Sequence, residues 1–245
     1  MDKNRKISLM LSFFVAALIL SNVLGAKIIE LHLPAFISIP LNIIFFPIIY
    51  LLKAFLFSIG GRDISLNFFN TVGVSVGILT VPIMFLITDV IEEVEGKKKV
   101  KEFIFVGVSA LIMTVVLTTI AVILPSAARS VDPAFYNAIF KVTIRMTIAS
   151  ILAFIIAQLH DMWSFDFWKK KTKGKHLWIR NNLSTIISQL IDSVIFMFVA
   201  FYKSAPMWDA VFVISLIVPY WIFKILFALL DTPFAYLGVW WLKKK

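Results

Sequence analysis

NNLSTIISQLIDSVIFMFVAF, residues 181–201, is apolar and long enough to cross a lipid bilayer, because a spanning helix needs ~20 predominantly apolar residues. Its first half nevertheless carries Thr185, Gln189 and Asp192, and a carboxylate in hydrocarbon costs on the order of 2.5 to 3.5 kcal/mol. The three residues are spaced by four and three positions, so a helix places them in one stripe. The stripe could simply bond neighbouring helices, but such bonds do not need a carboxylate. We therefore predict a spanning helix whose polar stripe lines a cavity.

The whole chain has the composition of an integral membrane protein. Of its 245 residues, 60% are hydrophobic and 16% are charged, and the mean hydropathy is +0.94. Long apolar runs recur from residue 7 to residue 242, which leaves almost nothing for a soluble domain. The absence of cysteine excludes disulfides, thiolate metal sites and cysteine nucleophiles. We expect a single integral membrane domain over residues 1–245, an all-α bundle of transmembrane helices embedded in the lipid bilayer.

Seven apolar segments can be distinguished, at residues 7–26, 37–59, 71–92, 103–125, 137–160, 182–202 and 208–230. Basic residues cluster outside them, within residues 3–6, 97–101, 169–180 and 243–245. The positive-inside rule places all four clusters, and hence both termini, in the cytoplasm. The net charge of +10 then indicates anchoring against anionic lipid, and nucleic acid is not an expected partner.

Segment 37–59 is one too many for this orientation, because three segments lie between the first two basic clusters. It contains Pro40, Pro47 and Lys53, which do not suit a straight spanning helix. We therefore expect six core spans and one additional apolar segment that re-enters the membrane or lies along it. The alternative is a seventh span, with the N-terminus outside despite its three basic residues.

The segment 71–92 leads into a group of acidic residues. Asp89 and Glu93 lie four residues apart on one helical face, with Glu92 and Glu95 beside them. Ionisable residues inside a span should face other protein or a watery cavity. An acidic helix end facing Lys97 to Lys99 in solvent is the alternative, and it suits Glu92 and Glu95 better than the deeper Asp89.

The fifth segment carries Arg145 near its start and Gln158 and Asp161 at its end. Ala149, Ala153 and Ala157 recur between them at four-residue spacing, which indicates close packing against another helix. Arg145 could instead extend to the outer membrane interface. His160 next to Asp161 invites a metal-site interpretation, but one such pair lacks further ligands.

Tyr220 and Lys224 share a helical face in the last segment. Lys224 can serve as the counter-charge of Asp192, Asp161 or Asp89, because paired charges cost less than isolated ones in a low dielectric. Around these polar residues the sequence offers no nucleophile with its base, no glycine-rich phosphate loop and no metal-ligand spacing. We therefore expect a carrier rather than an enzyme, with no catalytic residue, metal or cofactor. An intramembrane enzyme and a structural assembly factor are the rival interpretations.

Five stretches carry a resemblance to a known family: SNVLGAKI (21–28), TDVIEEVEGKKK (88–99), RMTIASILAFIIAQLHDMWSFDFWKKK (145–171), WIRNNLSTIISQLIDSVIFMFVAFY (178–202) and YWIFKILFALLDTPFAY (220–236). The chain resembles the queuosine precursor transporter family, also called the VUT family. The resemblance implies about six spans in the plasma or bacterial inner membrane. It also implies uptake of 7-deazapurines such as 7-cyano-7-deazaguanine and its aminomethyl relative, for tRNA modification. This sequence departs from the family pattern at two places: Glu95 stands where many members have an aromatic residue, and residues 37–70 look expanded relative to the shorter members.

The candidate substrate-binding residues combine the polar stripes with the positions that match the family's motifs. They are Asn22, Asp89, Glu93, Arg145, Gln158, Asp161, Thr185, Gln189, Asp192, Tyr220 and Lys224. A buried carboxylate can accept two adjacent N–H donors of a guanine-like ring, an amide can serve the carbonyl edge, and Phe196, Trp163 or Tyr220 could stack on the ring. Three modes of energy supply stay open: proton coupling, facilitated transport and a separate energising module. Whether the protein forms a homo-oligomer also stays open.

Overall fold

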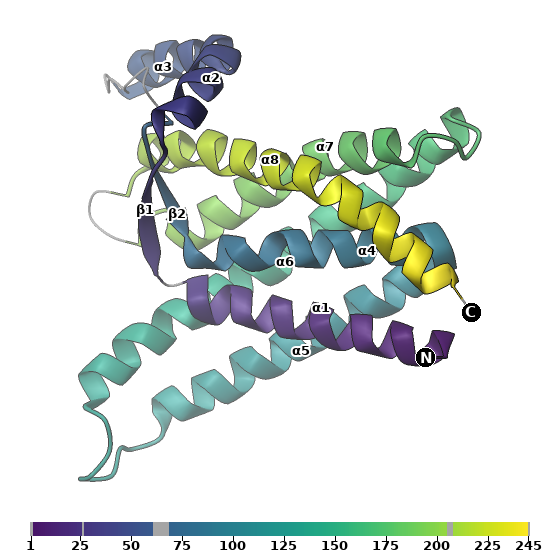
Figure 1. Ribbon diagram of the computed structural model, residues 1–245. Coiled ribbons are helices and arrows are strands. Elements are labelled where there is room, and N and C mark those ends of the chain that lie inside the picture. The colour runs from purple at the N-terminus through teal and green to yellow at the C-terminus, as the bar shows by residue number, and fades with distance from the viewer. Residues whose placement is uncertain (1, 26, 61–68, 205–207, 245) are drawn as a thin grey trace.

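The computed structural model describes residues 2–25, 27–60, 69–204 and 208–244, and most of them are helical. In chain order the elements are α1 (Lys3–Gly25), β1 (Ile28–His32), α2 (Ala35–Ile44), α3 (Phe46–Gly60), β2 (Thr71–Ser75), the 3-10 helix η1 (Val76–Thr80), α4 (Val81–Glu95), α5 (Lys97–Ile123), α6 (Pro133–Lys171), α7 (Leu177–Phe201) and α8 (Ala210–Lys243). Helices α1 and α4 to α8 form a bundle, whereas α2 and α3 stand apart at one end (Figure 1). The helical bundle predicted from the sequence is confirmed.

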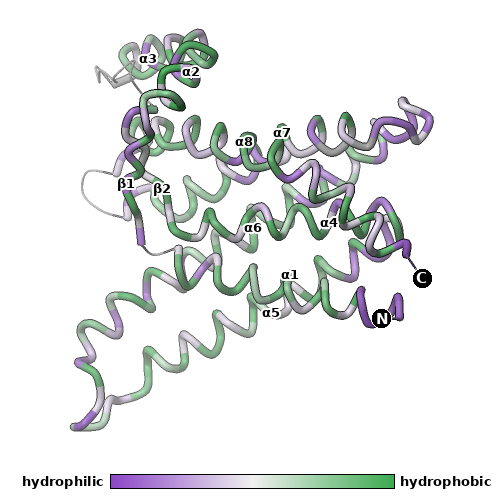
Figure 2. The backbone as a smooth tube through the Cα atoms, viewed as in Figure 1, coloured by the Kyte–Doolittle hydropathy of each residue, from purple (hydrophilic) through white to green (hydrophobic). Residues whose placement is uncertain are grey.

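Five of the helices, α1 and α5 to α8, are long and apolar enough to cross a membrane. Large apolar side chains face outward from them, among them Phe105 on α5 and Ile187 on α7. Hydrophilic residues gather near both chain ends and in the α5–α6 and α6–α7 connections (Figure 2). Apolar sides and polar ends are what a lipid environment requires, so the chain is a multi-pass membrane protein.

The helix expected over residues 71–92 is wrong at its start. Residues 71–75 form β2, which pairs antiparallel with β1 so that Ile28 lies opposite Ser75 and His32 opposite Thr71. The alternation of β-branched residues in TVGVS suits a strand, and η1 then leads into α4. Because α4 has 15 residues, it is only ~22 Å long. Helix α4 alone is therefore shorter than the ~30 Å hydrocarbon core of a bilayer.

The additional apolar segment 37–59 is broken in the middle. Helices α2 and α3 are bent by 70° relative to each other, with Phe45 between them. Pro47, at the start of α3, has no N–H to bond the carbonyl of Ile43, so α2 cannot continue through it. The segment is therefore not one straight helix, and the pair has the shape of a broken span or a re-entrant loop.

Both chain ends, the α4–α5 junction and the α6–α7 connection lie at the same end of the bundle (Figure 1). We call it the basic end, because it holds the basic residues within 3–6, 97–101, 169–175 and 243–244; Lys245 and the Arg180 side chain lie outside the described part. The opposite end, with β1 and β2, is the strand end. At the basic end, the Lys6 ammonium donates hydrogen bonds to the carbonyls of Trp241 (2.7 Å) and Lys244 (2.6 Å). These bonds join α1 to α8.

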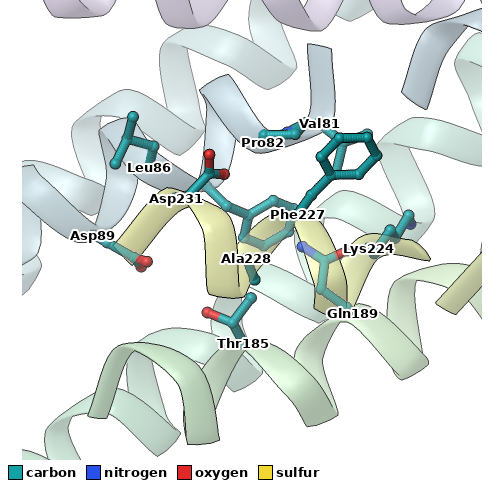
Figure 3. Close-up of a pocket in the computed structure, with 11 residues that line it drawn as sticks. Val81, Pro82, Leu86, Asp89, Thr185, Gln189, Lys224, Phe227, Ala228 and Asp231 are labelled. Atoms are coloured by element: carbon teal, nitrogen blue, oxygen red, sulfur yellow. The ribbon is translucent and has the colours of Figure 1, made fainter. Parts of the chain in front are cut away.

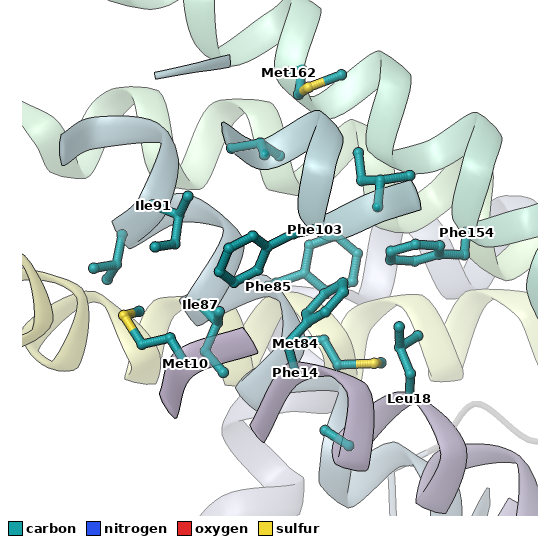
Figure 4. Close-up of a cluster of buried hydrophobic side chains, with 14 of the residues drawn as sticks. Met10, Phe14, Leu18, Met84, Phe85, Ile87, Ile91, Phe103, Phe154 and Met162 are labelled. Carbon is teal, nitrogen blue, oxygen red and sulfur yellow. The ribbon is translucent and has the colours of Figure 1, made fainter. Parts of the chain in front are cut away.

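A cluster of buried apolar side chains holds α1, α4, α5 and α6 together (Figure 4). Phe14 lies at its centre, with ring centroids 5.8 Å from Phe103 and 5.9 Å from Phe154. These tilted contacts between rings suit the charge distribution of aromatic faces and edges. The cluster fixes α4 against its neighbours and so positions the polar side chains of α4.

Close approach of η1 to α1 depends on Gly77. A Cβ atom at this position would lie 2.3 Å from the backbone carbonyl oxygen of Ser21, so Gly77→Ala must push the two elements apart. We expect this change to destabilise the protein by about 1 to 3 kcal/mol, the usual range for overpacking, and to lower its melting temperature in detergent.

Gly107→Ala is the matched control, because the nearest atoms to a Cβ there belong to side chains and not to the backbone: the end of Leu18 at 2.6 Å and the Phe14 ring at 2.9 Å. Leu18 can move by a rotamer change, whereas a backbone carbonyl cannot. A Gly77→Ala protein that melts at or above the temperature of Gly107→Ala would contradict the close approach.

Candidate functional site

An ion pair lies near the middle of α7 and α8. The Lys224 ammonium donates a hydrogen bond of 2.5 Å to the Asp192 carboxylate, and it also lies 4.8 Å from the centre of the Tyr220 ring. The side chain of Lys224 is 2% exposed and that of Asp192 is 18% exposed. A buried ammonium requires a partner, and here it has both a carboxylate and an aromatic face. Of the three counter-charges that the sequence offered for Lys224, the partner is Asp192.

One hollow lies beside Lys224 toward the basic end, between α4, α7 and α8, and we call it the inner hollow (Figure 3). Asp89, Thr185, Gln189 and Asp231 contribute its polar wall. The remaining lining residues are Val81, Pro82, Phe85, Leu86, Lys224, Phe227 and Ala228. Its cavity volume of about 10 Å³ is close to what one water molecule needs.

A second hollow lies beside Lys224 toward the strand end, and we call it the outer hollow. Aromatic rings from four helices line it, supplied by Phe85, Phe154, Phe196 and Tyr220. Its other lining residues are Leu18, Ser21, Val81, Met84, Ser150, Asp192 and Lys224, and its cavity volume is about 30 Å³. Because both hollows share Val81, Phe85 and Lys224, these side chains form the partition between them.

A layer of buried polar side chains on α6 and α7 lies near the inner hollow. The Gln158 amide is 3.5 Å from the Thr88 hydroxyl on α4. Asp161 accepts hydrogen bonds from Ser184 and Ser188 on α7. The Ser188 hydroxyl also lies 2.9 Å from Nδ1 of His160. This layer joins the polar face of α6 to the stripe of α7.

Several buried oxygens in this region have no hydrogen-bond partner among the residues that the structure describes. They are Oδ1 of Asp89, Oε1 of Glu92, Oε1 of Gln158, Oδ1 of Asp161, Oγ1 of Thr185 and Oε1 of Gln189. Burying a polar group without a partner costs about 1 to 3 kcal/mol. A concentration of such groups beside a hollow is unusual for a purely structural core and is typical of a binding site.

The structure brings most of the predicted site residues together. Asp89, Thr185, Gln189 and Lys224 line the inner hollow, and Asp192, Tyr220 and Lys224 line the outer one. Gln158 and Asp161 belong to the polar layer, and Asn22 is buried on α1, where its amide donates to Ser150 over 3.3 Å. Their placement supports the sequence prediction that polar stripes from separate helices converge.

Glu93 and Arg145 lie apart from both hollows. Glu93 is at the basic end, 3.3 Å from the ammonium of Lys169. The Arg145 guanidinium donates to the carbonyls of Val199 (3.1 Å) and Tyr202 (2.7 Å), where α7 ends. Helix ends leave carbonyls without intrahelical partners, and a cation there also complements the helix dipole. In this conformation Arg145 therefore caps α7.

Sequence reasoning missed several residues that the structure places at the site. Asp231 lines the inner hollow; the seven-residue spacing places it on the helical face of Lys224, but it was not among the candidate site residues. Phe85 and Phe227 gave no signal, because an apolar lining residue looks like any other apolar residue. Glu92 is buried, so the solvated helix end considered for it is wrong. Trp163, a candidate for stacking, is 63% exposed and lies outside both hollows.

The match to a protein family covers most of this site. A family model described as "Putative vitamin uptake transporter" matches residues 75–238. The chain belongs to this transporter family. The matched region contains every residue of the inner hollow and all of the outer hollow except Leu18 and Ser21.

Two curated proteins are similar in sequence to this chain. One is a "Probable queuosine precursor transporter" of Bacillus subtilis, 28% identical over 156 residues, which are 62% of this chain and 66% of the relative. The other, with the same name, is from Haemophilus influenzae and is 28% identical over 130 residues, which are 53% of this chain and 52% of the relative. The chain thus spans between half and two thirds of the relatives it matches. No solved structure matches it.

The ion pair of the transporter should respond asymmetrically to substitution. Asp192→Asn leaves the ammonium of Lys224 buried without its carboxylate, and we expect a loss of about 3 to 5 kcal/mol. Lys224→Met leaves a carboxylate that borders the outer hollow and is partly exposed, so the loss should be smaller.

The double variant tests the pairing itself, because removing both charges leaves neither one buried alone. Its loss of stability should be smaller than the sum of the two single losses, as measured by thermal melting of the purified variants in detergent. Equal single losses that add up in the double variant would show that the two charges are not coupled.

Proposed function

We propose that this transporter carries queuosine precursors, 7-deazapurines such as 7-cyano-7-deazaguanine and its aminomethyl relative, across the cell membrane into the cell. The observation that carries the proposal is the convergence of polar side chains from α4, α6, α7 and α8 on two hollows beside a buried ion pair. Ionisable residues are retained inside a membrane mainly where they line a substrate or ion path. The family match and the names of both relatives support this choice of substrate.

The chemistry of the outer hollow suits a flat heterocycle. A guanine-like ring presents N1–H and an exocyclic amine as adjacent donors, which the Asp192 carboxylate can accept together. The Lys224 ammonium, next to Asp192, can donate to the neighbouring ring carbonyl. Phe85, Phe154, Phe196 and Tyr220 offer aromatic faces for stacking, which is worth ~1 to 3 kcal/mol per base in nucleic-acid complexes.

Passage of such a molecule requires the partition to move. Each hollow holds about one water molecule, whereas drug-sized ligands occupy pockets of ~300 to 1,000 Å³. The partition of Val81, Phe85 and Lys224 therefore separates two halves of a path in this closed conformation. In the proposed cycle the bundle opens first at one end and then at the other, around a site near the membrane midplane.

The orientation follows from charge. The basic end holds both chain ends and the clusters near residues 97–101 and 169–175. Positively charged segments stay in the cytoplasm, so we place the basic end inside the cell and the strand end outside. The substrate then enters at the strand end.

A carrier for another purine-like or vitamin-like heterocycle is the second candidate, favoured by the description of the family. The site chemistry of ring stacking and a bidentate carboxylate suits several such molecules. Uptake experiments with competing unlabelled compounds separate the two candidates, because only the true substrate suppresses uptake at low concentration.

Uptake should depend on Gln189 and not on its outward-facing neighbour Ile187. In cells that cannot synthesise queuosine precursors, expression of the wild-type protein should restore queuosine in tRNA from labelled 7-cyano-7-deazaguanine or its aminomethyl relative in the medium. Gln189→Leu removes a polar group from the inner hollow at similar volume, and we expect initial uptake to fall about tenfold or more.

Ile187→Leu is the matched control, since Ile187 lies two residues away on the same helix and is 49% exposed. Membrane amounts of both variants are measured by immunoblot. If the test cells that express the wild-type protein take up neither compound, the proposed function is refuted. Equal uptake by the Gln189→Leu and Ile187→Leu variants would remove Gln189 from the site.

A further inference from the structure

We propose that the inner hollow receives an ammonium group of the substrate, so that the protein prefers an aminomethyl-bearing heterocycle to the nitrile of the same ring. The inference rests on the proposed function and refines it by naming which member of the substrate class is preferred. It concerns the end of the molecule that lies toward the inner hollow, whereas the ring itself lies in the outer hollow.

The polar atoms of the described residues that are left without a partner at the inner hollow are oxygens. Asp89, Thr185 and Gln189 line the inner hollow, and each has a buried oxygen that bonds to nothing among the described residues. In the layer near them, Gln158 and Asp161 each have one more. The carboxylate and amide oxygens accept hydrogen bonds, and the Thr185 hydroxyl can accept as well as donate, so a ligand that brings donors satisfies all of them. An ammonium brings three donors, whereas a nitrile brings none.

The need for a donor does not depend on which way the Gln158 and Gln189 amides are turned. Turning the Gln158 or Gln189 amide by half a turn would exchange an oxygen for a nitrogen. Ionised carboxylate oxygens, in contrast, accept hydrogen bonds in every rotamer. An ammonium placed beside Asp89 and Asp161, which are 4% and 2% exposed, stabilises both as carboxylates and donates to them.

Acidic side chains outnumber basic ones around the inner hollow. Asp89 is close enough to Asp161, Glu92 and Asp231 for their like charges to interact. Lys224, the cation that borders the hollow, is already engaged by Asp192. The surroundings thus hold more carboxyl groups than cations, and burying them as carboxylates without a counter-charge is costly. A cationic ligand offsets this imbalance, whereas a neutral one does not.

Lys97 and Lys169, at the basic end, do not fill this deficit by direct contact. Lys97 pairs with Asp166 at 3.1 Å, and Lys169 pairs with Glu93 at 3.3 Å. These pairs lie outside the lining of the inner hollow. The narrowness of the hollow also fits a single methylene and ammonium better than a ring, because the cavity volume is about 10 Å³ before any movement.

The experiment compares two ligands that differ only at this group. Wild-type protein in lipid nanodiscs is titrated with 7-aminomethyl-7-deazaguanine and with 7-cyano-7-deazaguanine at pH 7, and dissociation constants are measured by calorimetry. We expect the aminomethyl compound to bind at least about tenfold more tightly. Asp89→Asn keeps the shape and removes the charge, so it should weaken aminomethyl binding about tenfold and leave cyano binding nearly unchanged.

Asp166→Asn is the control, because Asp166 pairs with Lys97 and Lys170 away from the hollow and should not change the ratio. Asp231→Asn is the second variant, in case Asp89→Asn does not fold. Equal or tighter binding of the cyano compound by wild-type protein overturns the inference while the proposed function stands. Equal weakening of both compounds by the aspartate variants also overturns it, and binding of neither compound by wild-type protein removes the proposed function instead.

Discussion

A charge inside a bilayer is tolerated only where another charge or a set of polar groups compensates for lost water, and this constraint organises the interior of the protein. Lys224 satisfies it with Asp192 and the Tyr220 ring. The pair requires α7 and α8 to lie side by side, and two further bonds fix that arrangement: the Trp221 indole donates to the Ile186 carbonyl over 2.8 Å, and the Asn182 amide donates to Thr232 over 3.0 Å. Lys224 also belongs to the partition between the two hollows. The ion pair with Asp192 that stabilises its charge therefore lies where the two hollows are separated.

The apolar and polar parts of the bundle have different tasks. The aromatic cluster around Phe14 packs α1, α4, α5 and α6 through apolar contacts and supplies a frame of fixed shape. On α4, Asp89 and Glu92 each have a buried oxygen without a partner among the described residues. Such groups lower stability, and a frame with tight packing can tolerate them. The short α4 lies between the two parts, so it takes part in both.

Spacing predicted the site better than it predicted the chain path. The stripe of Thr185, Gln189 and Asp192 and the pair of Tyr220 and Lys224 follow from helical periodicity, because residues three and four apart share a face. Periodicity within one helix carries no information on which helices are neighbours, so it left three possible partners for Lys224. It also gave no reason to expect that Arg145 bonds backbone carbonyls of α7, since those acceptors belong to every residue alike. Strand β2 was missed because a short apolar run of β-branched residues fits a strand and a buried helix equally well.

The bonds from Lys6 to the far end of α8 have a consequence for biogenesis. Lys6 is 5% exposed, and the carbonyls that receive its hydrogen bonds lie 235 and 238 residues later in the chain. During synthesis α1 therefore enters the membrane long before its partner exists, and its lysine must remain hydrated at the basic end until α8 has been inserted. Closure of the bundle at that end is then one of the last steps of assembly, and a truncated nascent chain would expose a marker that quality-control proteases could recognise.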